Sequence, residues 1–128
     1  MKLLLDTHIF LWYISGDERL SKSIRESIQN FDNRIYLSVV SIWEAIVKYN
    51  LGKLPLPNPP ALYLPKQRNQ HKISSLELDE ASVCQLTKLP PIHRDPFDRI
   101  LICQAMEKGL TIVTQDKVIS DYSVPILK

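Results

Sequence analysis

The sequence predicts an α/β fold built on a mainly parallel sheet. Short apolar runs of strand length alternate with longer segments in which apolar residues recur at helical spacing, and this alternation is typical of α/β proteins. The strand-length runs are almost continuously apolar, as in strands that a parallel sheet buries on both faces. With 45% hydrophobic and 23% charged residues, the 128-residue chain has the composition of a globular protein, and we expect one domain over residues 1–128.

Two strands and three helices are expected in the first half of the chain. They are a strand at KLLL (2–5), a helix at THIFLWYIS (7–15), an amphipathic helix within 18–30, a strand at RIYLS (34–38) and a helix at SIWEAIVKYNLG (41–52). The amphipathic helix is predicted because Leu20, Ile24 and Ile28 lie four residues apart and share one helix face. Gly52 is expected at the C-cap of the last helix, since glycine adopts the left-handed conformation without steric penalty.

The second half begins with a proline-rich connection and then returns to alternating elements. The expected order is a turn-rich stretch at 53–65 with a short helix near 60–69, a short strand at 72–74, a helix at 79–88, a loop at 89–95, a helix at 96–110, a strand at TIVT (111–114), a turn with a short helix at 115–122 and an edge strand at VPIL (124–127). The helix at 96–110 has the clearest boundaries, because Pro96 occupies its first turn and Gly109 follows its last.

Cysteine usage, charge and hydropathy narrow the class of protein. Cys84 and Cys103 lie in apolar helical segments without metal-ligand spacing, so we expect buried free thiols and no zinc site. The chain has neither a signal-peptide pattern at its start nor an apolar run of membrane-spanning length, and we expect a cytoplasmic protein without membrane contact. A net charge of +2 neither requires nor excludes a nucleic-acid partner.

The acidic residues next to helix starts each have a purely structural interpretation. Asp6 follows a strand and precedes a helix, where aspartate is a common N-cap. Glu44 lies three residues after Ser41, which is a capping-box pattern. DPFD (95–98) repeats that pattern with proline at the first helical position, and Asp116 is placed to cap the segment after TIVT.

The same acids also share a place in the predicted sheet. Asp6 and Asp116 both follow the C-terminal end of a strand, at the edge where open α/β sheets bind ligands. Glu44 lies in the first turns of the helix after the second strand and can reach this edge. Asp98 lies in the first turn of the helix that leads to TIVT, although the sequence does not establish at which edge, and it shares a helix face with Asp95.

Carboxylates gathered at one edge raise one another's pKa values unless a cation lies between them. Hard divalent cations such as Mg²⁺ or Mn²⁺ favour oxygen-only ligand sets of this kind. Spacing alone therefore favours a metal-dependent phosphodiesterase, beside the alternative that the acids only cap helices in a protein that is not an enzyme.

Three motifs resemble those of PIN-domain ribonucleases, and among these the VapC-type toxins of bacterial toxin–antitoxin pairs. The motifs are LLLDTHIFLW (3–12), SVVSIWEAIVKYNLGKL (38–54) and HRDPFDRILICQAMEKGLTIVTQD (93–116), in the order of the family and almost from end to end of the chain. The resemblance implies a three-layer α/β/α fold with a central, mainly parallel sheet of four to five strands. It also implies that the metal-binding catalytic carboxylates are Asp6, Glu44, Asp98 and Asp116. Asp95 is the extra acid of the DPFDR-bearing branch, and it is a further ligand, a group that tunes the ligands, or only a helix cap.

The activity that the resemblance implies is hydrolysis of RNA phosphodiester bonds with Mg²⁺ or Mn²⁺ and without a protein nucleophile. Residues next to the acids that the motifs suggest for orienting water or a carboxylate are Thr7, Ser41 and Thr114. Candidates for contact with the RNA backbone, each equally explained as a surface charge or an intrachain salt bridge, are Arg94, Arg99, Lys48 and Lys117. His93 is a candidate for substrate contact, but the preferred interpretation is a loop histidine without a function, and His8 near the first acid is interpreted in the same way.

The resemblance further implies a homodimer and a VapB-like antitoxin whose C-terminal segment blocks the site, with the helices within 18–30 and 41–51 as candidate contact surfaces. Trp12 and Trp43, at helical spacing among apolar residues, are interpreted as core or dimer-interface residues. The alternative function is a metal-dependent nuclease or phosphatase on the same fold without a role as a toxin.

Overall fold

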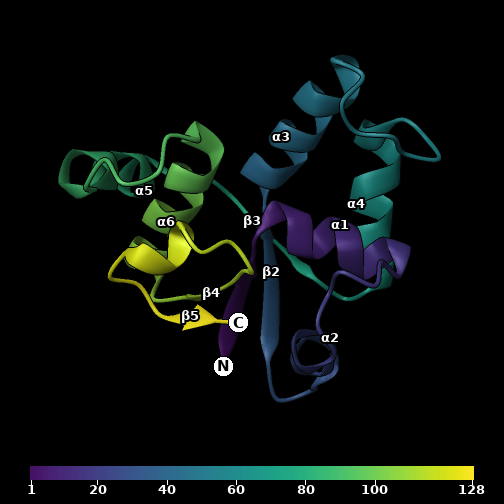
Figure 1. The fold of residues 1–128 in the computed structure, drawn as a ribbon, viewed down its shortest axis with the longest axis horizontal. Coiled ribbons are helices and arrows are strands. Elements are labelled where there is room, and N and C mark those ends of the chain that lie inside the picture. The colour runs from purple at the N-terminus through teal and green to yellow at the C-terminus, as the bar shows by residue number, and fades with distance from the viewer.

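Five parallel strands form one sheet in the computed structural model, which describes residues 1–128 (Figure 1). The strands are β1 (Lys2–Leu5), β2 (Arg34–Ser38), β3 (Ser74–Leu76), β4 (Thr111–Val113) and β5 (Ile126–Leu127). Their order in the sheet is β3-β2-β1-β4-β5, so β1 is central and pairs in parallel with both β2 and β4. The observed sheet confirms the predicted parallel α/β fold of four to five strands.

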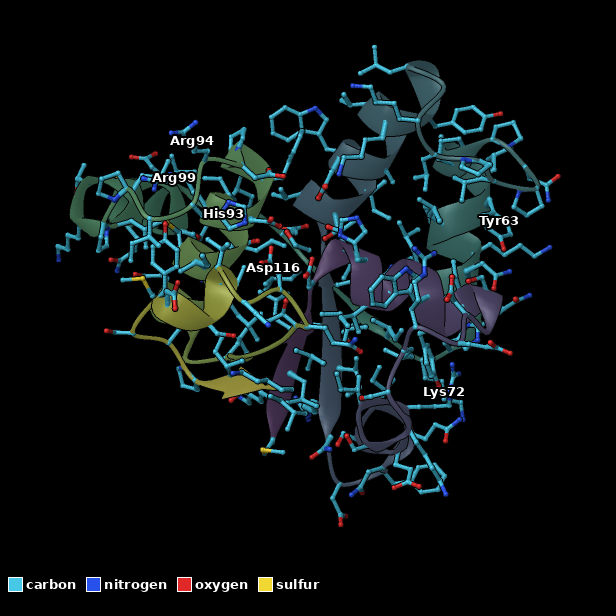
Figure 2. The ribbon with its side chains drawn as sticks, in the orientation of Figure 1. Tyr63, Lys72, His93, Arg94, Arg99 and Asp116 are labelled. Carbon is cyan, nitrogen blue, oxygen red and sulfur yellow. The ribbon has the colours of Figure 1, made fainter.

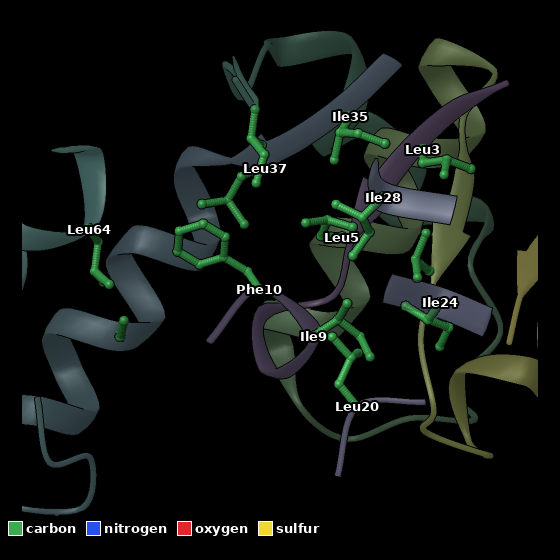
Figure 3. Packing of buried hydrophobic residues seen from close by; sticks show 13 residues of the cluster. Leu3, Leu5, Ile9, Phe10, Leu20, Ile24, Ile28, Ile35, Leu37 and Leu64 are labelled. Carbon is green, nitrogen blue, oxygen red and sulfur yellow. The ribbon is translucent and has the colours of Figure 1, made fainter. Parts of the chain in front are cut away.

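Helices cover both faces of this sheet, and β1 shows why. Leu3 and Leu5 belong to one hydrophobic cluster, drawn in Figure 3, while Leu4 between them belongs to a second cluster on the other face. Figure 1 shows α1, α2 and α4 on one side of the sheet and α5 and α6 on the other. The α-helices are α1 (Thr7–Ser15), α2 (Lys22–Gln29), α3 (Val39–Asn50), α4 (Pro60–Gln70), α5 (Glu80–Cys84) and α6 (Pro96–Lys108), and the 3-10 helices are η1 (Gln85–Lys88) and η2 (Ile119–Asp121). The three-layer arrangement expected from the resemblance is confirmed.

The expected elements are all present, and several boundaries differ. The strand predicted at 72–74 lies at Ser74–Leu76, and the helix predicted at 79–88 is an α-helix only to Cys84 before it tightens into η1. The edge strand predicted at 124–127 is shorter, at Ile126–Leu127. Cys84 is exposed, so the prediction that it is buried is wrong, while Cys103 is buried as expected.

The start of α3 corrects the capping-box interpretation of Ser41 and Glu44. The helix begins at Val39 rather than at 41, because Ser38 at the end of β2 is the N-cap and its hydroxyl accepts a hydrogen bond from the Val40 amide at 3.0 Å. Ser41 and Glu44 therefore both lie inside the helix and are buried. Gly52, the predicted C-cap, lies one residue beyond the C-cap Leu51 with a φ of 71°, where its left-handed backbone ends the helix.

The order of the strands determines where a ligand site can form. The chain leaves β1 toward β2 on one side of the sheet, and β4 adds to β1 on the other side. In open parallel sheets the carboxyl ends of two such strands border a crevice, because the connections that follow them diverge to opposite faces. Here this position lies between the residues that follow β1 and β4. None of the helices has the length and apolarity needed to cross a bilayer.

Candidate metal centre

The structure places the four predicted acids at this crevice. Asp6 directly follows β1, and Asp116 is the third residue after the end of β4. Glu44 lies in the second turn of α3 and Asp98 in the first turn of α6, whose N-termini are at the same edge of the sheet. Asp6, Glu44 and Asp98 are buried and Asp116 is half-buried. The edge on which Asp98 lies, open from the sequence, is therefore that of the other acids.

One oxygen of each buried acid lies against a donor group of the chain. The Thr114 hydroxyl donates to Asp6 Oδ2 at 2.8 Å. The Lys48 ammonium donates to Glu44 Oε2 at 2.5 Å, one helical turn along α3. The third oxygen, Oδ2 of Asp98, lies 3.1 Å from Nε2 of His93. These contacts fix the orientation of the carboxylates before any ligand arrives.

Two other carboxylate oxygens in the centre are buried without any hydrogen-bond partner, Oδ1 of Asp6 and Oε1 of Glu44. Buried polar atoms in folded proteins nearly always have a partner, because an unpaired one forfeits its hydration without compensation. A divalent cation between these oxygens supplies the missing interaction, and carboxylate oxygens are the ligands that hard cations prefer. The residues present therefore fit a divalent metal ion.

The electrostatics of the acids lead to the same conclusion. The pKa of Asp98 is raised from 3.8 to about 8, chiefly by burial and then by the charges of Asp6, Asp95, Glu44 and Asp116. Burial also raises the pKa of Asp6, although the hydrogen bond from Thr114 acts in the opposite direction. Such carboxyls resist ionisation until a positive charge is placed among them.

Asp95, which had three interpretations from the sequence, is the N-cap of α6. Its Oδ1 accepts from the amide of Phe97 at 2.8 Å and from that of Asp98 at 3.4 Å. Asp6 also occupies an N-cap position, but its side chain makes no capping hydrogen bond and is directed to Thr114 instead. Asp116 is not the N-cap of η2, which is Val118, but its Oδ1 accepts from the Val118 amide at 2.9 Å while its Oδ2 faces His93.

The hydroxyl residues predicted near the acids fall into two groups. Thr114 bonds to Asp6 and also accepts from the Asp116 amide at 3.0 Å, so it joins two acids of the centre. Thr7 donates instead to Ser41 at 2.8 Å, in a buried contact that ties α1 to α3.

The four predicted RNA-binding cations are differently placed. Lys48 is paired with Glu44, and Arg99 donates from Nη1 to the carbonyl of Pro90 at 3.1 Å. Arg94 and Lys117 are exposed. Figure 2 shows Arg94 and Arg99 on the side of α6 that faces away from Asp116. RNA contact by these residues remains a prediction.

His93 is a member of the centre that the sequence interpretation left without a function. Its Nε2 lies 3.1 Å from Asp98 Oδ2 and 3.2 Å from Asp116 Oδ2, and Figure 2 shows the ring directed toward Asp116. The sequence has no local signal for this position, because His93 lies two residues before the N-cap of α6 and Arg94 between them faces away from Asp116.

The two tryptophans differ, because Trp12 packs against the first hydrophobic cluster and Trp43 is exposed. Trp43 is 56% exposed and meets Phe97 edge-on, while Trp12 is half-buried under the Arg19 guanidinium, 4.9 Å from the ring centroid. The core interpretation is therefore wrong for Trp43, and a dimer contact remains a prediction.

A parallel α/β sheet with buried carboxylates at its topological switch point is typical of proteins that can hold a divalent cation through acidic side chains. The chain matches the PIN domain family over residues 3–125 and belongs to that family.

Two ribonucleases are similar to this chain in sequence. Ribonuclease VapC16 of Mycobacterium tuberculosis is 42% identical over 57 residues, which are 44% of this chain and 40% of that protein. Ribonuclease VapC22 of the same organism is 24% identical over 124 residues, which are 96% of this chain and 93% of that protein. The chain thus aligns with less than half of the first relative and with nearly all of the second.

Several solved structures have a similar fold. A chain of VapBC2 from Rickettsia felis, bound to a DNA fragment from its promoter, superposes with a TM-score of 0.73 at 14% identity and covers 99% of this chain and 98% of that one. A chain of a toxin–antitoxin complex from Klebsiella pneumoniae gives a TM-score of 0.65 at 12% identity, with coverages of 98% and 96%. At these identities the likeness establishes a common fold.

Proposed function

We propose that this protein is an endoribonuclease that depends on Mg²⁺ or Mn²⁺ and is the toxin of a toxin–antitoxin pair. The observation that carries the proposal is the pair of buried, unpartnered carboxylate oxygens on Asp6 and Glu44, next to Asp98 and Asp116. Membership of the PIN family and the ribonucleases among its relatives support RNA as the substrate. Asp6, Glu44 and Asp98 are the residues that would hold the ion, with Asp116 beside them.

When bound, the ion supplies an activated water and a counter-charge for the phosphate oxygens. The residues of the chain prepare the site for it. Thr114 and Lys48 hold one oxygen each of Asp6 and Glu44, so that the second oxygen of each faces the centre without rearrangement. Asp95 caps α6 and thereby fixes the turn from which Asp98 extends.

A cavity beside the acids offers a path for the substrate. A cavity of about 330 Å³ is lined by Asp6 and Asp116 together with His8, Trp12 and Arg19. His8, Trp12 and Arg19 also line a neighbouring cavity of about 430 Å³. Lys53 of the proline-rich connection and Tyr63 of α4 line this second cavity as well. We infer that RNA crosses this surface with phosphates near the Arg19 and Lys53 side chains and that binding weakens as salt is added.

Arg19 is better placed for such a contact than the cations chosen from the sequence. Asp17 holds its guanidinium through Nε at 3.1 Å and Nη2 at 2.7 Å. Gln115, the neighbour of Asp116, donates to the Arg19 carbonyl at 3.1 Å. Arg19 thus lines both cavities with an exposed guanidinium paired to Asp17, and the signal that was missed is the Asp-x-Arg spacing.

A VapB-like antitoxin and a second copy of this chain are the proposed partners. The toxin–antitoxin assemblies among the structures of the same fold support the first of these. A small neighbouring reading frame for a DNA-binding protein, whose product suppresses the growth arrest that this chain causes, would favour a toxin. Cleavage of RNA without growth arrest would favour the alternative, a metal-dependent nuclease without a toxin role.

The activity is tested with the purified protein and a pool of structured RNAs in Mg²⁺, in Mn²⁺ and in chelator. We expect cleavage with either ion and none in chelator. Asp6→Asn and Asp98→Asn should each abolish cleavage, while Asp32→Asn, a change of an exposed acid in the loop before β2, should leave it intact. Cleavage that persists in chelator or in both active-centre variants would contradict the metal–carboxylate mechanism.

A further inference from the structure

The proline-rich connection between α3 and α4 forms one wall of the larger of the two neighbouring cavities. Residues 53–57 all line this cavity of about 430 Å³. Leu54 and Leu56 are half-buried and pack against the hydrophobic cluster drawn in Figure 3, while Pro55 and Pro57 are exposed. Proline fixes its own φ and carries no N–H that would need a partner. The wall is therefore apolar, attached to the core and shaped before a ligand arrives.

Aromatic rings and a guanidinium also line this cavity. Trp12 of α1 and Tyr63 of α4, the second labelled in Figure 2, are half-buried, and both contribute to the lining. The Arg19 guanidinium lies 4.9 Å from the centroid of the Trp12 ring, and Asp17 accepts from its Nε at 3.1 Å and from its Nη2 at 2.7 Å. The Arg19 side chain is nevertheless 69% exposed. A guanidinium held against an indole in this way offers a surface on which a further flat ring can stack.

The cavity continues into the smaller one beside the metal centre. His8, Trp12 and Arg19 line both cavities, and the smaller one also contains Asp6 and Asp116. A ligand that spans the two therefore has one part at the acids and another among apolar and aromatic side chains. A nucleotide has this construction, because a charged phosphate and a flat base are joined through one sugar. The larger cavity is also within the range of small-molecule sites, about 300–1,000 Å³.

We propose that this cavity, the base pocket, holds one unpaired nucleobase of the RNA substrate beside the bond that is cut, an inference that rests on the ribonuclease function proposed above. Unpaired bases in RNA are recognised by stacking on aromatic or arginine side chains and by hydrogen bonds to their polar edges. Asp17 also lines the pocket, and its carboxylate can accept from an amino group of a base. The base pocket then gives the enzyme a preference for the nucleotide at one position next to the cut.

Continuity with the acids favours a base over a segment of a partner protein as the occupant. The metal ion requires a phosphate in the smaller cavity, and the neighbouring base of the same strand then lies within reach of the larger one. The wall at 53–57 is formed in advance, so little ordering opposes the binding of a rigid ring. A protein segment is the competing occupant, and it predicts that nucleotides do not bind in the base pocket.

Binding is tested in the metal-free protein in chelator, where no cleavage interferes. The chain has two tryptophans, of which Trp12 lines the base pocket and Trp43 lines neither cavity. Their indole ¹H–¹⁵N signals are assigned with Trp43→Phe and followed during titration with each of the four ribonucleoside 5′-monophosphates and with ribose 5-phosphate. We expect at least one nucleotide to shift the Trp12 signal and to leave that of Trp43 in place, and ribose 5-phosphate to shift neither signal appreciably.

Two results of this titration would overturn the base pocket. Equal shifts of the Trp12 signal with ribose 5-phosphate and with the nucleotides would mean that the cavity binds only phosphate. The absence of a shift with all four nucleotides would leave the cavity to a protein segment.

The contribution of stacking is tested with Tyr63. Tyr63→Leu removes the ring, keeps an apolar side chain and should weaken the nucleotide that binds best by a factor on the order of ten, as expected for the loss of one stacked base. Tyr63→Phe keeps the ring and should retain most of the affinity. Phe31→Leu, a change of a ring that is 98% exposed in the loop before β2 and lines neither cavity, is the matched control and should bind as the wild type. Unchanged affinity in Tyr63→Leu would contradict stacking on this ring.

Selectivity is tested by sequencing the fragments that the wild type and Tyr63→Leu produce from single-stranded RNA of random sequence in Mn²⁺. We expect the wild type to enrich the best-binding nucleotide at one position next to the cut and Tyr63→Leu to lose this enrichment. Cleavage without enrichment, or with equal enrichment in both proteins, would overturn the base pocket and leave the ribonuclease function standing. Nucleotide binding in chelator without cleavage of any RNA in Mn²⁺ would instead overturn the ribonuclease function, so the two failures are distinguishable.

Discussion

Asp98 lies buried among other carboxylates, and its pKa of about 8 makes the metal-free centre sensitive to pH. In the unfolded chain the group titrates near 3.8, so between these values the folded protein binds a proton that the unfolded protein does not. The stability associated with this proton is present below pH 3.8 and is lost as the pH rises through 8. The shift of Asp6 has the same sign.

We therefore expect Asp98→Asn to stabilise the metal-free protein at alkaline pH, by an amount on the order of a few kcal/mol because the variant cannot ionise. The measurement is the free energy of unfolding in chelator at pH 5 and pH 8.5 for the wild type and the variant. The difference between the two proteins should grow with pH. Equal pH dependence in both proteins would show that Asp98 ionises normally.

Thr114 allows a second prediction at the residue scale. Its hydroxyl donates to Asp6 and accepts from the Asp116 amide, and it is fully buried. Thr114→Val keeps the shape and leaves both partners unsatisfied, which costs about 1–3 kcal/mol of unfolding free energy. Thr114→Ser keeps the hydroxyl and should lose much less. Urea denaturation of the two variants measures the losses, and a loss in Thr114→Ser as large as that in Thr114→Val would mean that the methyl group contributes as much as the hydrogen bonds.

At the scale of elements, α6 shows how a capping residue serves the centre. Asp95 caps the helix, and Asp98 extends from the turn that this cap fixes. Asp95→Ala should lower the free energy of unfolding by about 1 kcal/mol, while Asp95→Asn retains the capping oxygen and should be close to the wild type.

The same two variants separate capping from metal binding by Asp95. If the residue only caps the helix, Asp95→Asn keeps the wild-type affinity for Mn²⁺ in a titration. Loss of a ligand would instead weaken binding on the order of tenfold or more, the size of effect that even residues outside the ligand set produce.

The elements were predictable from the sequence wherever the local pattern agreed with the tertiary structure. The α6 boundaries follow from Pro96 and Gly109, and both are observed. The start of α3 was misjudged because Val39 and Val40 are β-branched and resemble a continuation of β2, whereas Ser38 is the residue that ends the strand and caps the helix. The strand β3 was predicted to begin at residue 72 because Ile73 is apolar, and Ile73 is indeed buried, but pairing with β2 begins only at Ser74.

At the scale of the whole molecule, the placement of the acids depends on sheet order. That Asp6 and Asp116 share an edge followed from their positions after strands, since parallel strands present their carboxyl ends together. The edge of Asp98 and the place of His93 in the centre could not be predicted, because both depend on how α6 and its preceding loop pack on the sheet. Tyr122, which anchors that loop, lies 29 residues from His93 in sequence, beyond the reach of any local pattern.

The centre joins segments from both ends of the chain, and this leads to the last prediction. An ion held by Asp6, Glu44 and Asp98 links the end of β1 to α3 and α6, contacts that no partly unfolded chain retains. Because the ion binds the folded state alone, Mn²⁺ at 100 times its Kd should add about 2.7 kcal/mol to the free energy of unfolding. Thermal unfolding with and without Mn²⁺ measures the gain, which Glu44→Gln should abolish and Asp32→Asn should keep. If Glu44→Gln is stabilised as much as the wild type, the ion binds elsewhere, and the unpartnered oxygen of Glu44 has another explanation.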